Sequence, residues 1–275
     1  MNKRIEKKNN FIKSNKPIAN HSLGQHFLID KNITKKIVGL AGNLKDKYVY
    51  EVGPGTGNLT KEILNANAKK VFTIERDKRF SNYLEDLKDS NQNLEIIYDD
   101  ALKFDESKII NNQTIVISNL PYNISTQLLV KWIISNLQFK ELILMFQKEV
   151  AQRINAERAN KNYGRLSVLV QWKYISKIVM NISSSSFIPK PKVDSSIIHL
   201  IKRDKEIAPA PTREFLYILQ HSFRHRRKMI KNNLRYIHPD YDKILSQAKI
   251  EGHRRAEDIS IKEFCNLASI YSKLI

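Results

Sequence analysis

The stretch Tyr48-Val-Tyr-Glu-Val-Gly-Pro-Gly-Thr-Gly57 decides how the fold of this 275-residue chain is interpreted. Its first half is mostly apolar, with two tyrosines and two valines, which predicts a buried strand over residues 48–52. Gly53, Gly55 and Gly57 follow at alternate positions, and glycines let a backbone turn sharply and approach a ligand closely. An apolar stripe at helical spacing comes next. Strand, glycine loop and helix together predict a ligand-binding unit of the α/β class.

Strand and helix patterns alternate on either side of this unit. The further strand patterns are Val71–Ile74, Leu94–Tyr98, Thr114–Ser118 and Glu141–Phe146, and the helical ones are Lys31–Leu40, Phe80–Leu87 and Thr126–Ile134. Such alternation predicts a mostly parallel sheet with helices on both faces. A helix passing into a strand is expected over 163–174. Residues 175–182 and 193–200 are expected to form an antiparallel pair at the edge of the sheet.

The whole chain divides into three parts. Residues 22–205 are predicted to form a Rossmann-like domain. Ala208-Pro-Ala-Pro211 is typical of a linker, and residues 206–275 show helical patterns without a strand, which predicts a small all-helical C-terminal domain. Residues 1–21 are basic and rich in asparagine, and we expect a flexible tail there.

Composition narrows the class of partner. The net charge is +19, from 47 lysines and arginines against 28 acids, and this favours a polyanion such as nucleic acid. No run of about 18 apolar residues and no secretory signal occurs, so we expect a cytoplasmic protein without a membrane partner. Its single cysteine excludes a disulfide within the chain.

Two acids follow the next strands. Glu75 lies 18 residues past Gly57 and is placed to bind ribose hydroxyls. Asp100 follows the third strand and is placed to accept a hydrogen bond from the adenine amine of a cofactor, with a helix N-cap as the alternative. The Gly-x-Gly-x-Gly spacing favours a nucleoside ligand over a pyrophosphate. A nicotinamide dehydrogenase remains an alternative, but it would need a hydride-transfer site that we do not find.

Asn119-Leu-Pro-Tyr122 follows the fourth strand, beside the glycine loop in such a sheet. An adenine N6 is a poor nucleophile because its lone pair is delocalised into the ring. The side-chain oxygen of Asn119 and the carbonyl of Leu120 are placed to accept its two hydrogens, while Pro121 fixes the turn. Tyr122 is expected to stack on a base withdrawn from its own stack. No general base is required, because alignment of the reacting atoms supplies most of the catalysis.

Two basic segments are expected to contact RNA. The loop from Phe187 to Asp194 holds Lys190 and Lys192, and Phe187 is placed to close the other face of the target base. Further along, residues 221–234 are predicted to form one helix without acids whose basic residues face RNA: Arg224, Arg226, Arg227, Lys228 and Lys231. His221 and His225 have the spacing of a zinc pair, but without a third ligand nearby we expect no metal site.

With these motifs in view, the chain from about Ser22 to Ile270 resembles the KsgA family of ribosomal RNA adenine dimethyltransferases. The motifs that carry the resemblance are residues 23–28, 51–57, 119–125, 147–150, 163–167 and 187–194, with the Arg-Arg-Lys at 226–228. The resemblance implies a Rossmann-like S-adenosylmethionine-dependent methyltransferase. It also implies dimethylation of two adjacent adenosines near the 3′ end of 16S rRNA, in an assembling small ribosomal subunit.

The resemblance also assigns a cofactor site at matching positions: His26, Leu28, Gly53, Glu75, Asp100 and Asn119. One departure is that the family usually has Gln-Asn-Phe where this chain has Gln25-His-Phe27, and we expect the His26 imidazole to donate a hydrogen bond in place of the amide. We expect a monomer. Two alternatives stay open: a resistance methyltransferase of large-subunit rRNA, and a non-catalytic RNA-binding or transcription factor on the same fold.

Overall fold

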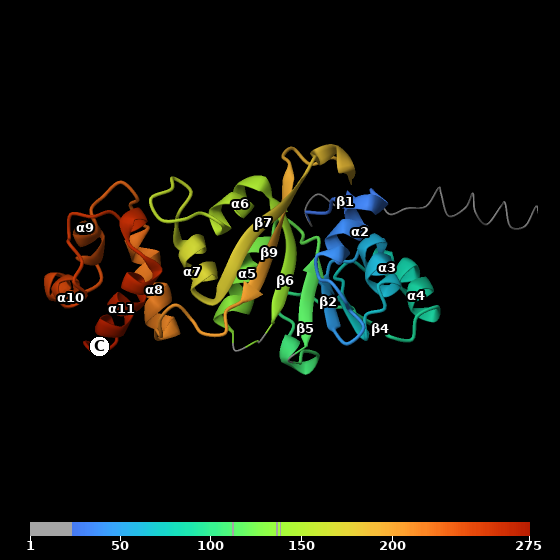
Figure 1. Cartoon of the computed structure of the whole chain (residues 1–275), viewed down its shortest axis with the longest axis horizontal. Helices are drawn as coiled ribbons and strands as arrows, with labels where there is room; N and C mark the ends of the chain where they lie inside the picture. Colours follow the sequence, from blue (N-terminus) through green and yellow to red (C-terminus); the bar gives the residue numbers. More distant parts are fainter. Residues whose placement is uncertain (1–23, 112, 136, 138) are drawn as a thin grey trace, which may run out of the picture.

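The computed structural model describes residues 24–275 except 112, 136 and 138, so the predicted tail over 1–21 lies outside the described residues (Figure 1). It contains a seven-stranded sheet of order β4-β3-β2-β5-β6-β9-β7 and a two-stranded sheet of β1 and β8. The strands are β1 Phe27–Leu28, β2 Tyr48–Val52, β3 Lys70–Ile74, β4 Leu94–Ile97, β5 Thr114–Ser118, β6 Glu141–Gln147, β7 Tyr174–Ile182, β8 Phe187–Ile188 and β9 Ser195–Lys202.

The large sheet is parallel through most of its width. Strands β4, β3, β2, β5 and β6 pair in parallel, whereas β9 pairs antiparallel with β6 and with β7. The predicted antiparallel pair at the edge is confirmed, with β7 outermost. The chain runs from β2 outward to β4 and then returns through β5 to the other side of β2. The order of strands therefore reverses between β2 and β5, which is where open α/β sheets bind ligands.

Helices cover both faces because side chains along each buried strand alternate between them. Val49, Ile115 and Ile143 pack with α2 and α3 on one face, and Tyr50 and Val116 pack with α5 and α7 on the other. The helices are α2 Lys31–Gly39, α3 Asn58–Asn65, α4 Ser81–Asp89, α5 Ser125–Ile134, α6 Lys148–Ile154, α7 Arg165–Lys173, α8 Thr212–Ser222, α9 Ile230–Leu234, α10 Tyr241–Gln247 and α11 Ile261–Tyr271. No helix in the described part of the chain is long and apolar enough to cross a membrane.

The last four helices form a layer at the opposite end of the molecule from α2, α3 and α4 (Figure 1). Phe215 of α8 and Phe264 of α11 belong to the same buried cluster as Trp172 of α7. The hydroxyl of Tyr163 donates to the carbonyl of Ile259, 3.0 Å away, inside this junction. The helical C-terminal region is therefore present as predicted, and its core is continuous with that beside α7.

One predicted helix is wrong. Residues 221–234 do not form a single helix, because α8 ends at Ser222 and α9 begins only at Ile230. The buried side chain of Asn233 explains the break: its amide donates to the carbonyls of Ser222, at 2.8 Å, and His225, at 3.3 Å. These bonds hold the chain after α8 in a turn and leave the basic residues between 224 and 228 on an irregular segment.

Two features were not predicted. Helix α6 follows β6 directly, with no glycine or proline between them to mark its start. Strands β1 and β8 pair antiparallel, with Leu28 opposite Phe187, although the second of them lies in what we predicted to be a loop. This small sheet fixes the segment before α2 over the end of the large sheet.

Candidate cofactor and catalytic site

A cavity lies at the carboxyl ends of the central parallel strands. Five segments line it: residues 24–28, residues between 51 and 59, residues 74–76, residues 99–101 and residues 119–124. Four of them follow or include the ends of β2, β3, β4 and β5, and the fifth is the segment that carries β1. The structure thus brings together the predicted glycine loop, both predicted acids and the Asn119–Tyr122 turn.

The glycine loop lies close against two of the other segments. A Cβ on Gly53, where φ is +70°, would lie 3.2 Å from Cγ of Pro121, and a Cβ on Gly55, where φ is +54°, would lie 2.7 Å from Cε1 of Phe27. Side chains are therefore excluded at both positions. Gly57 does not line the cavity. A Cβ there would lie 2.4 Å from Cδ1 of Leu87 in α4, so the glycine allows α3 and α4 to approach closely, and its cofactor contact stays a prediction.

Glu75 closes the end of β3 beside the glycine loop. One carboxylate oxygen accepts from the amide of Gly55 at 3.0 Å, and the other accepts from the amide of Asp77 at 2.8 Å. Burial raises the pKa of Glu75, and the two amides oppose that shift. Each oxygen keeps a second lone pair, so the carboxylate can also accept from ribose hydroxyls as predicted.

Asp77 connects this acid to the segment that carries β1. Its carboxylate accepts from Nε2 of Gln25 at 2.9 Å and pairs with Arg79 at 2.6 Å. The Arg79 hydrogen bond lowers the pKa of Asp77 to about 2, with Gln25 assisting and burial opposing. Asp77 is therefore ionised at every physiological pH, which keeps Gln25 in place at the rim of the cavity.

Asp100 holds its own loop and also faces a cation. Its Oδ1 accepts from the amide of Leu102 at 3.0 Å, and its Oδ2 lies 3.5 Å from Nη1 of Arg76. The carboxylate therefore caps a turn and not a helix, so the helix N-cap considered from the sequence is not formed. It also lines the cavity, where a second lone pair on each oxygen can accept from an adenine amine.

His26 and Leu28 lie at the cavity wall, but their contacts differ from those expected. Nδ1 of His26 lies 2.8 Å from the carbonyl of Pro189. Since a carbonyl only accepts, Nδ1 carries the hydrogen, and the neutral ring keeps Nε2 as an acceptor. The expected donation from His26 to the cofactor, which would have to come from Nε2, stays a prediction. The carbonyl of Leu28 accepts from Asn58 at 3.0 Å.

The Asn119–Tyr122 turn lines the cavity along its whole length. Nδ2 of Asn119 donates to the carbonyl of His26 at 3.0 Å, which fixes the amide plane. The side chain of Leu120 is buried, and this leaves its backbone as the part available for recognition. The ring of Tyr122 lies 5.3 Å from that of His26, and its hydroxyl bonds to Oγ of Ser195.

Phe187 does not reach this cavity in the structure. Its ring is 2% exposed and belongs to the buried cluster on the α2 side of the sheet. Its strand partner Leu28, however, does line the cavity. The predicted stacking of Phe187 on a target base thus remains a prediction that would require the ring to leave its core position.

Glu51 is a cavity residue that the sequence did not reveal. Its side chain is 1% exposed and accepts a hydrogen bond from Oγ1 of Thr60 at 2.7 Å. Burial raises the pKa of Glu51 to about 8, with Glu75 contributing in the same direction and Thr60 opposing. The available signal was an acid in the middle of an otherwise apolar strand.

The predicted RNA-binding residues lie outside the cavity and are exposed: Lys190, Lys192, Arg224, Arg226, Arg227, Lys228 and Lys231. Arg226 differs from the others because it also has partners within the protein. Its guanidinium donates to the carbonyls of Lys161 and Tyr163, each at 2.7 Å, and lies 3.8 Å from Glu257. Arg226 therefore ties the basic segment to the chain before α7.

The site defines a class of protein. A glycine loop without room for Cβ atoms, an acid at the end of β3, and an amide-bearing turn after β5 meet at the reversal of strand order. These groups suit an adenosine-bearing ligand with a polar tail. Among such ligands, S-adenosylmethionine is the one used by this class of fold when an Asn-x-Pro-Tyr turn follows the fourth strand beside the loop. The fold and site are those of an S-adenosylmethionine-dependent methyltransferase.

Comparison with known proteins identifies the family. Residues 17–273 match the family described as Ribosomal RNA adenine dimethylase. The chain is 42% identical over 259 residues to the Ribosomal RNA small subunit methyltransferase A of Bartonella henselae, covering 92% of each, and 40% identical over 254 residues to that of Paracoccus denitrificans, covering 91% and 90%. The chain belongs to this family of ribosomal RNA adenine dimethylases, as the resemblance to the KsgA family implied.

Solved structures agree on the fold. A dimethyladenosine transferase from Plasmodium falciparum superposes with a TM-score of 0.76 at 29% identity, covering 90% of this chain and 98% of that one. The 23S rRNA methyltransferase ErmE has a TM-score of 0.67 at 23% identity, covering 90% and 99%. The second likeness shows a shared fold alone.

Proposed function

We propose that this protein dimethylates N6 of two adjacent adenosines near the 3′ end of 16S rRNA, within the assembling small ribosomal subunit. The relatives at about 40% identity are small-subunit methyltransferases by name, and this supports the choice of subunit. The net charge of +19 supports RNA as the direct partner. We further propose that the protein acts as a monomer in the cytoplasm.

The orientation of Asn119 is the observation that carries this proposal. Because Nδ2 donates to the carbonyl of His26, the carboxamide oxygen is the atom left to accept a hydrogen bond on the cavity side. An exocyclic amine offers two hydrogens, and an amide oxygen with a neighbouring backbone carbonyl, that of Leu120, can accept both. A carbonyl on a substrate has no hydrogen to donate and could not use these two acceptors.

Methyl transfer then follows from positioning. S-adenosylmethionine, when bound, supplies a methyl group on a sulfonium. Asn119 and Leu120 would accept the two N6 hydrogens, which would turn the N6 lone pair out of the ring plane. The methyl group would then pass to N6 with the neutral sulfide as leaving group, and the N6 proton would leave to water. Tyr122, fixed through Ser195, stacks on the base.

The exposed basic residues supply the proposed RNA contacts. Lys190 and Lys192 lie on the loop that also holds Pro189, the partner of His26 at the cavity wall. They are close enough in sequence to that contact to bind phosphates that flank the target base. Arg224, Arg227 and Lys228, on the segment between α8 and α9, and Lys231, in the first turn of α9, would bind RNA farther from the cavity.

The test is methyl transfer from labelled S-adenosylmethionine to unmethylated small subunits, naked 16S rRNA and large-subunit rRNA, followed by digestion to nucleosides. We expect N6,N6-dimethyladenosine from small subunits. Label on large-subunit rRNA would instead indicate the resistance activity. Absence of label on every substrate would indicate a binding factor without catalysis.

Asn119→Ala tests the mechanism within the same assay. We expect turnover to fall at least about 100-fold, the loss typical of removing one transition-state hydrogen bond, while cofactor affinity changes little. Asn65→Ala at the end of α3 is the matched control, since that asparagine is exposed and does not line the cavity. Turnover by Asn119→Ala at the wild-type rate would remove this residue from the mechanism.

A further inference from the structure

The loop that carries Asp100 has little local structure to hold it in place. After Asp100, the chain forms a turn in which the amides of Lys103 and Phe104 both donate to the Asp100 carbonyl at 2.9 Å. These bonds shape the turn but do not attach it to the sheet or to a helix. Asp99, Asp100 and Ala101 nevertheless form one wall of the cofactor cavity.

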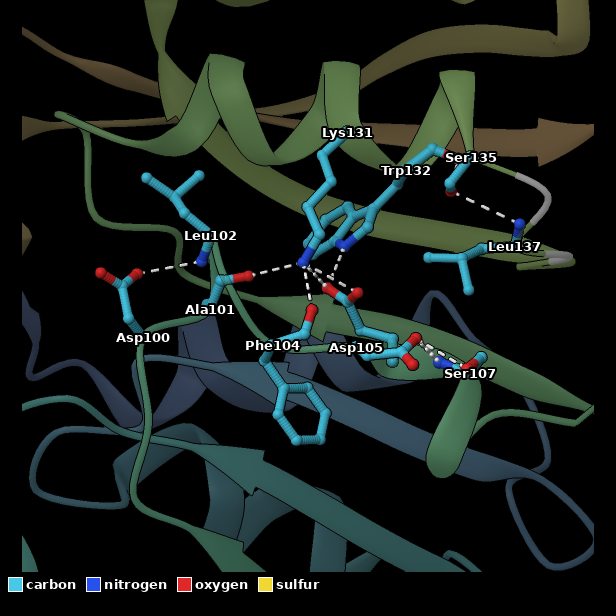
Figure 2. Close-up of polar contacts among 11 residues, drawn as sticks. Asp100, Ala101, Leu102, Phe104, Asp105, Ser107, Lys131, Trp132, Ser135 and Leu137 are labelled. Atoms are coloured by element: carbon cyan, nitrogen blue, oxygen red, sulfur yellow. Dashed lines mark hydrogen bonds and ion pairs between the residues drawn. The ribbon is translucent and has the colours of Figure 1, made fainter.

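Lys131 of α5 attaches this loop to the fold (Figure 2). Its ammonium donates to the carbonyl of Ala101 at 2.8 Å, to the carbonyl of Phe104 at 2.6 Å and to the carboxylate of Glu106 at 2.9 Å. An ammonium has three hydrogens, so these three acceptors satisfy it fully. All three come from the six residues that begin at Ala101.

Glu106 explains why this attachment is rigid. Its side chain is 1% exposed, and the same oxygen that accepts from Lys131 also accepts from Nε1 of Trp132 at 2.8 Å. A buried carboxylate is costly unless it is paired and hydrogen-bonded. Lys131 and Trp132, adjacent residues of α5, therefore hold both ends of the loop. Lys131 bonds the loop's carbonyls at its start, and both residues bond the carboxylate of Glu106 at its end.

Helix α5 is also the continuation of the catalytic turn. It begins at Ser125, three residues after Tyr122, and its Ser125 hydroxyl donates to the Tyr122 carbonyl at 3.1 Å. The element that leaves the catalytic turn is therefore the one that holds the Asp100 loop. A shift of the loop relative to α5 would displace the adenine end of the cofactor from the Asn119 end of the cavity.

We propose that Lys131 is a positioning residue for cofactor binding, which holds Asp100 at the cavity wall by bonding the Ala101 and Phe104 carbonyls from α5. The proposal rests on the cofactor role given to Asp100 and is independent of which RNA is methylated. Lys131 does not line the cavity, so its loss acts on cofactor binding only through the loop that carries Asp100. Loss of Lys131 should therefore weaken binding of the adenosine portion and leave kcat at saturating cofactor nearly unchanged.

The experiment measures binding of S-adenosylhomocysteine, which has the adenosine portion but no transferable methyl, by calorimetry without RNA. Lys131→Met alone leaves Glu106 buried and unpaired, so the decisive variant is Lys131→Met with Glu106→Gln. The introduced glutamine side chain carries no charge and can still accept from Trp132. We expect this double variant to recover thermal stability relative to Lys131→Met. Its Kd should nevertheless remain raised about 10-fold.

Two comparisons separate positioning from general destabilisation. Adding Asp100→Asn to the double variant should weaken binding much less than Asp100→Asn weakens the wild type, because both changes act through one loop. Ile244→Ala, a fully buried site in α10, should lower stability without changing the Kd. A Kd within twofold of wild type in the double variant would overturn the proposal, and so would an affinity that follows stability across all variants. Wild-type binding by Asp100→Asn alone would overturn it too.

Discussion

The buried acid Glu51 makes a prediction about stability that can be worked out in detail. Its side chain is 1% exposed and accepts a hydrogen bond from Thr60. Burial raises its pKa from 4.5 to about 8 in the folded protein, whereas the unfolded chain exposes it to water. Between these two pH values the folded protein keeps a proton that the unfolded chain has lost.

The sign and size of the effect follow from this difference. Because the folded state binds more protons, the free energy of unfolding falls as pH rises from about 4.5 to about 8 and is constant beyond. Each pKa unit between the unfolded and folded values changes the free energy of unfolding by about 1.4 kcal/mol, so the full shift changes it by about 5 kcal/mol at most. Glu51→Gln cannot ionise and still accepts from Thr60, so it should not lose this stability.

Urea unfolding followed by circular dichroism at pH 5, 6, 7 and 8 measures the effect. We expect Glu51→Gln to match the wild type at pH 5 within about 1 kcal/mol and to exceed it increasingly toward pH 8. Glu149→Gln is the control, because that glutamate is 70% exposed, and its difference from wild type should not vary with pH. A difference between Glu51→Gln and wild type that stays constant over this range would refute the buried, protonated state of Glu51.

Two further substitutions test local packing, one in the glycine loop with a control elsewhere and one at the junction with the C-terminal helices. Gly55→Ala should destabilise the fold by about 1–3 kcal/mol and weaken S-adenosylhomocysteine binding at least 10-fold, because φ is +54° and the new Cβ would lie 2.7 Å from Phe27. Gly39→Ala, in a helix with no atom within 4 Å of its Cβ, should be neutral or stabilising, and equal thermal shifts for both would contradict the reasoning. Tyr163→Phe should cost about 1–3 kcal/mol by leaving the carbonyl of Ile259 unpaired in the junction with the C-terminal helices. An unchanged thermal midpoint for Tyr163→Phe would show that this bond does not stabilise the junction.

Local patterns were sufficient for most of the sheet. The strand over Tyr48–Val52 and the strand over Thr114–Ser118 have the predicted bounds, because both are mostly apolar, buried runs that end at a clear turn signal. The predicted meeting of the glycine loop with Asn119 follows from the parallel order of the strands. These are properties of single segments and of the α/β rule that assembles them.

Features that depend on distant side chains could not be predicted in the same way. The break between α8 and α9 depends on Asn233, whose buried amide turns back onto residues eleven and eight positions earlier. Arg226 was expected to face RNA, and its bonds to the carbonyls at 161 and 163 come from a segment more than sixty residues away. Neither contact leaves a periodic trace in the sequence.

The residues expected to do the chemistry are held by segments that the motifs themselves do not contain. Asn119 is oriented by the carbonyl of His26, ninety-three residues away, and that contact would persist with almost any side chain at position 26 because it uses the backbone. Asp100, in contrast, depends on the side chain of Lys131 through the carbonyls beside it. Substitution at 26 should therefore leave the acceptor for the target amine in place, whereas substitution at 131 should change the cofactor wall. This chain's departure from the family pattern at His26 is thus compatible with retained catalysis, for a reason that the sequence alone does not show.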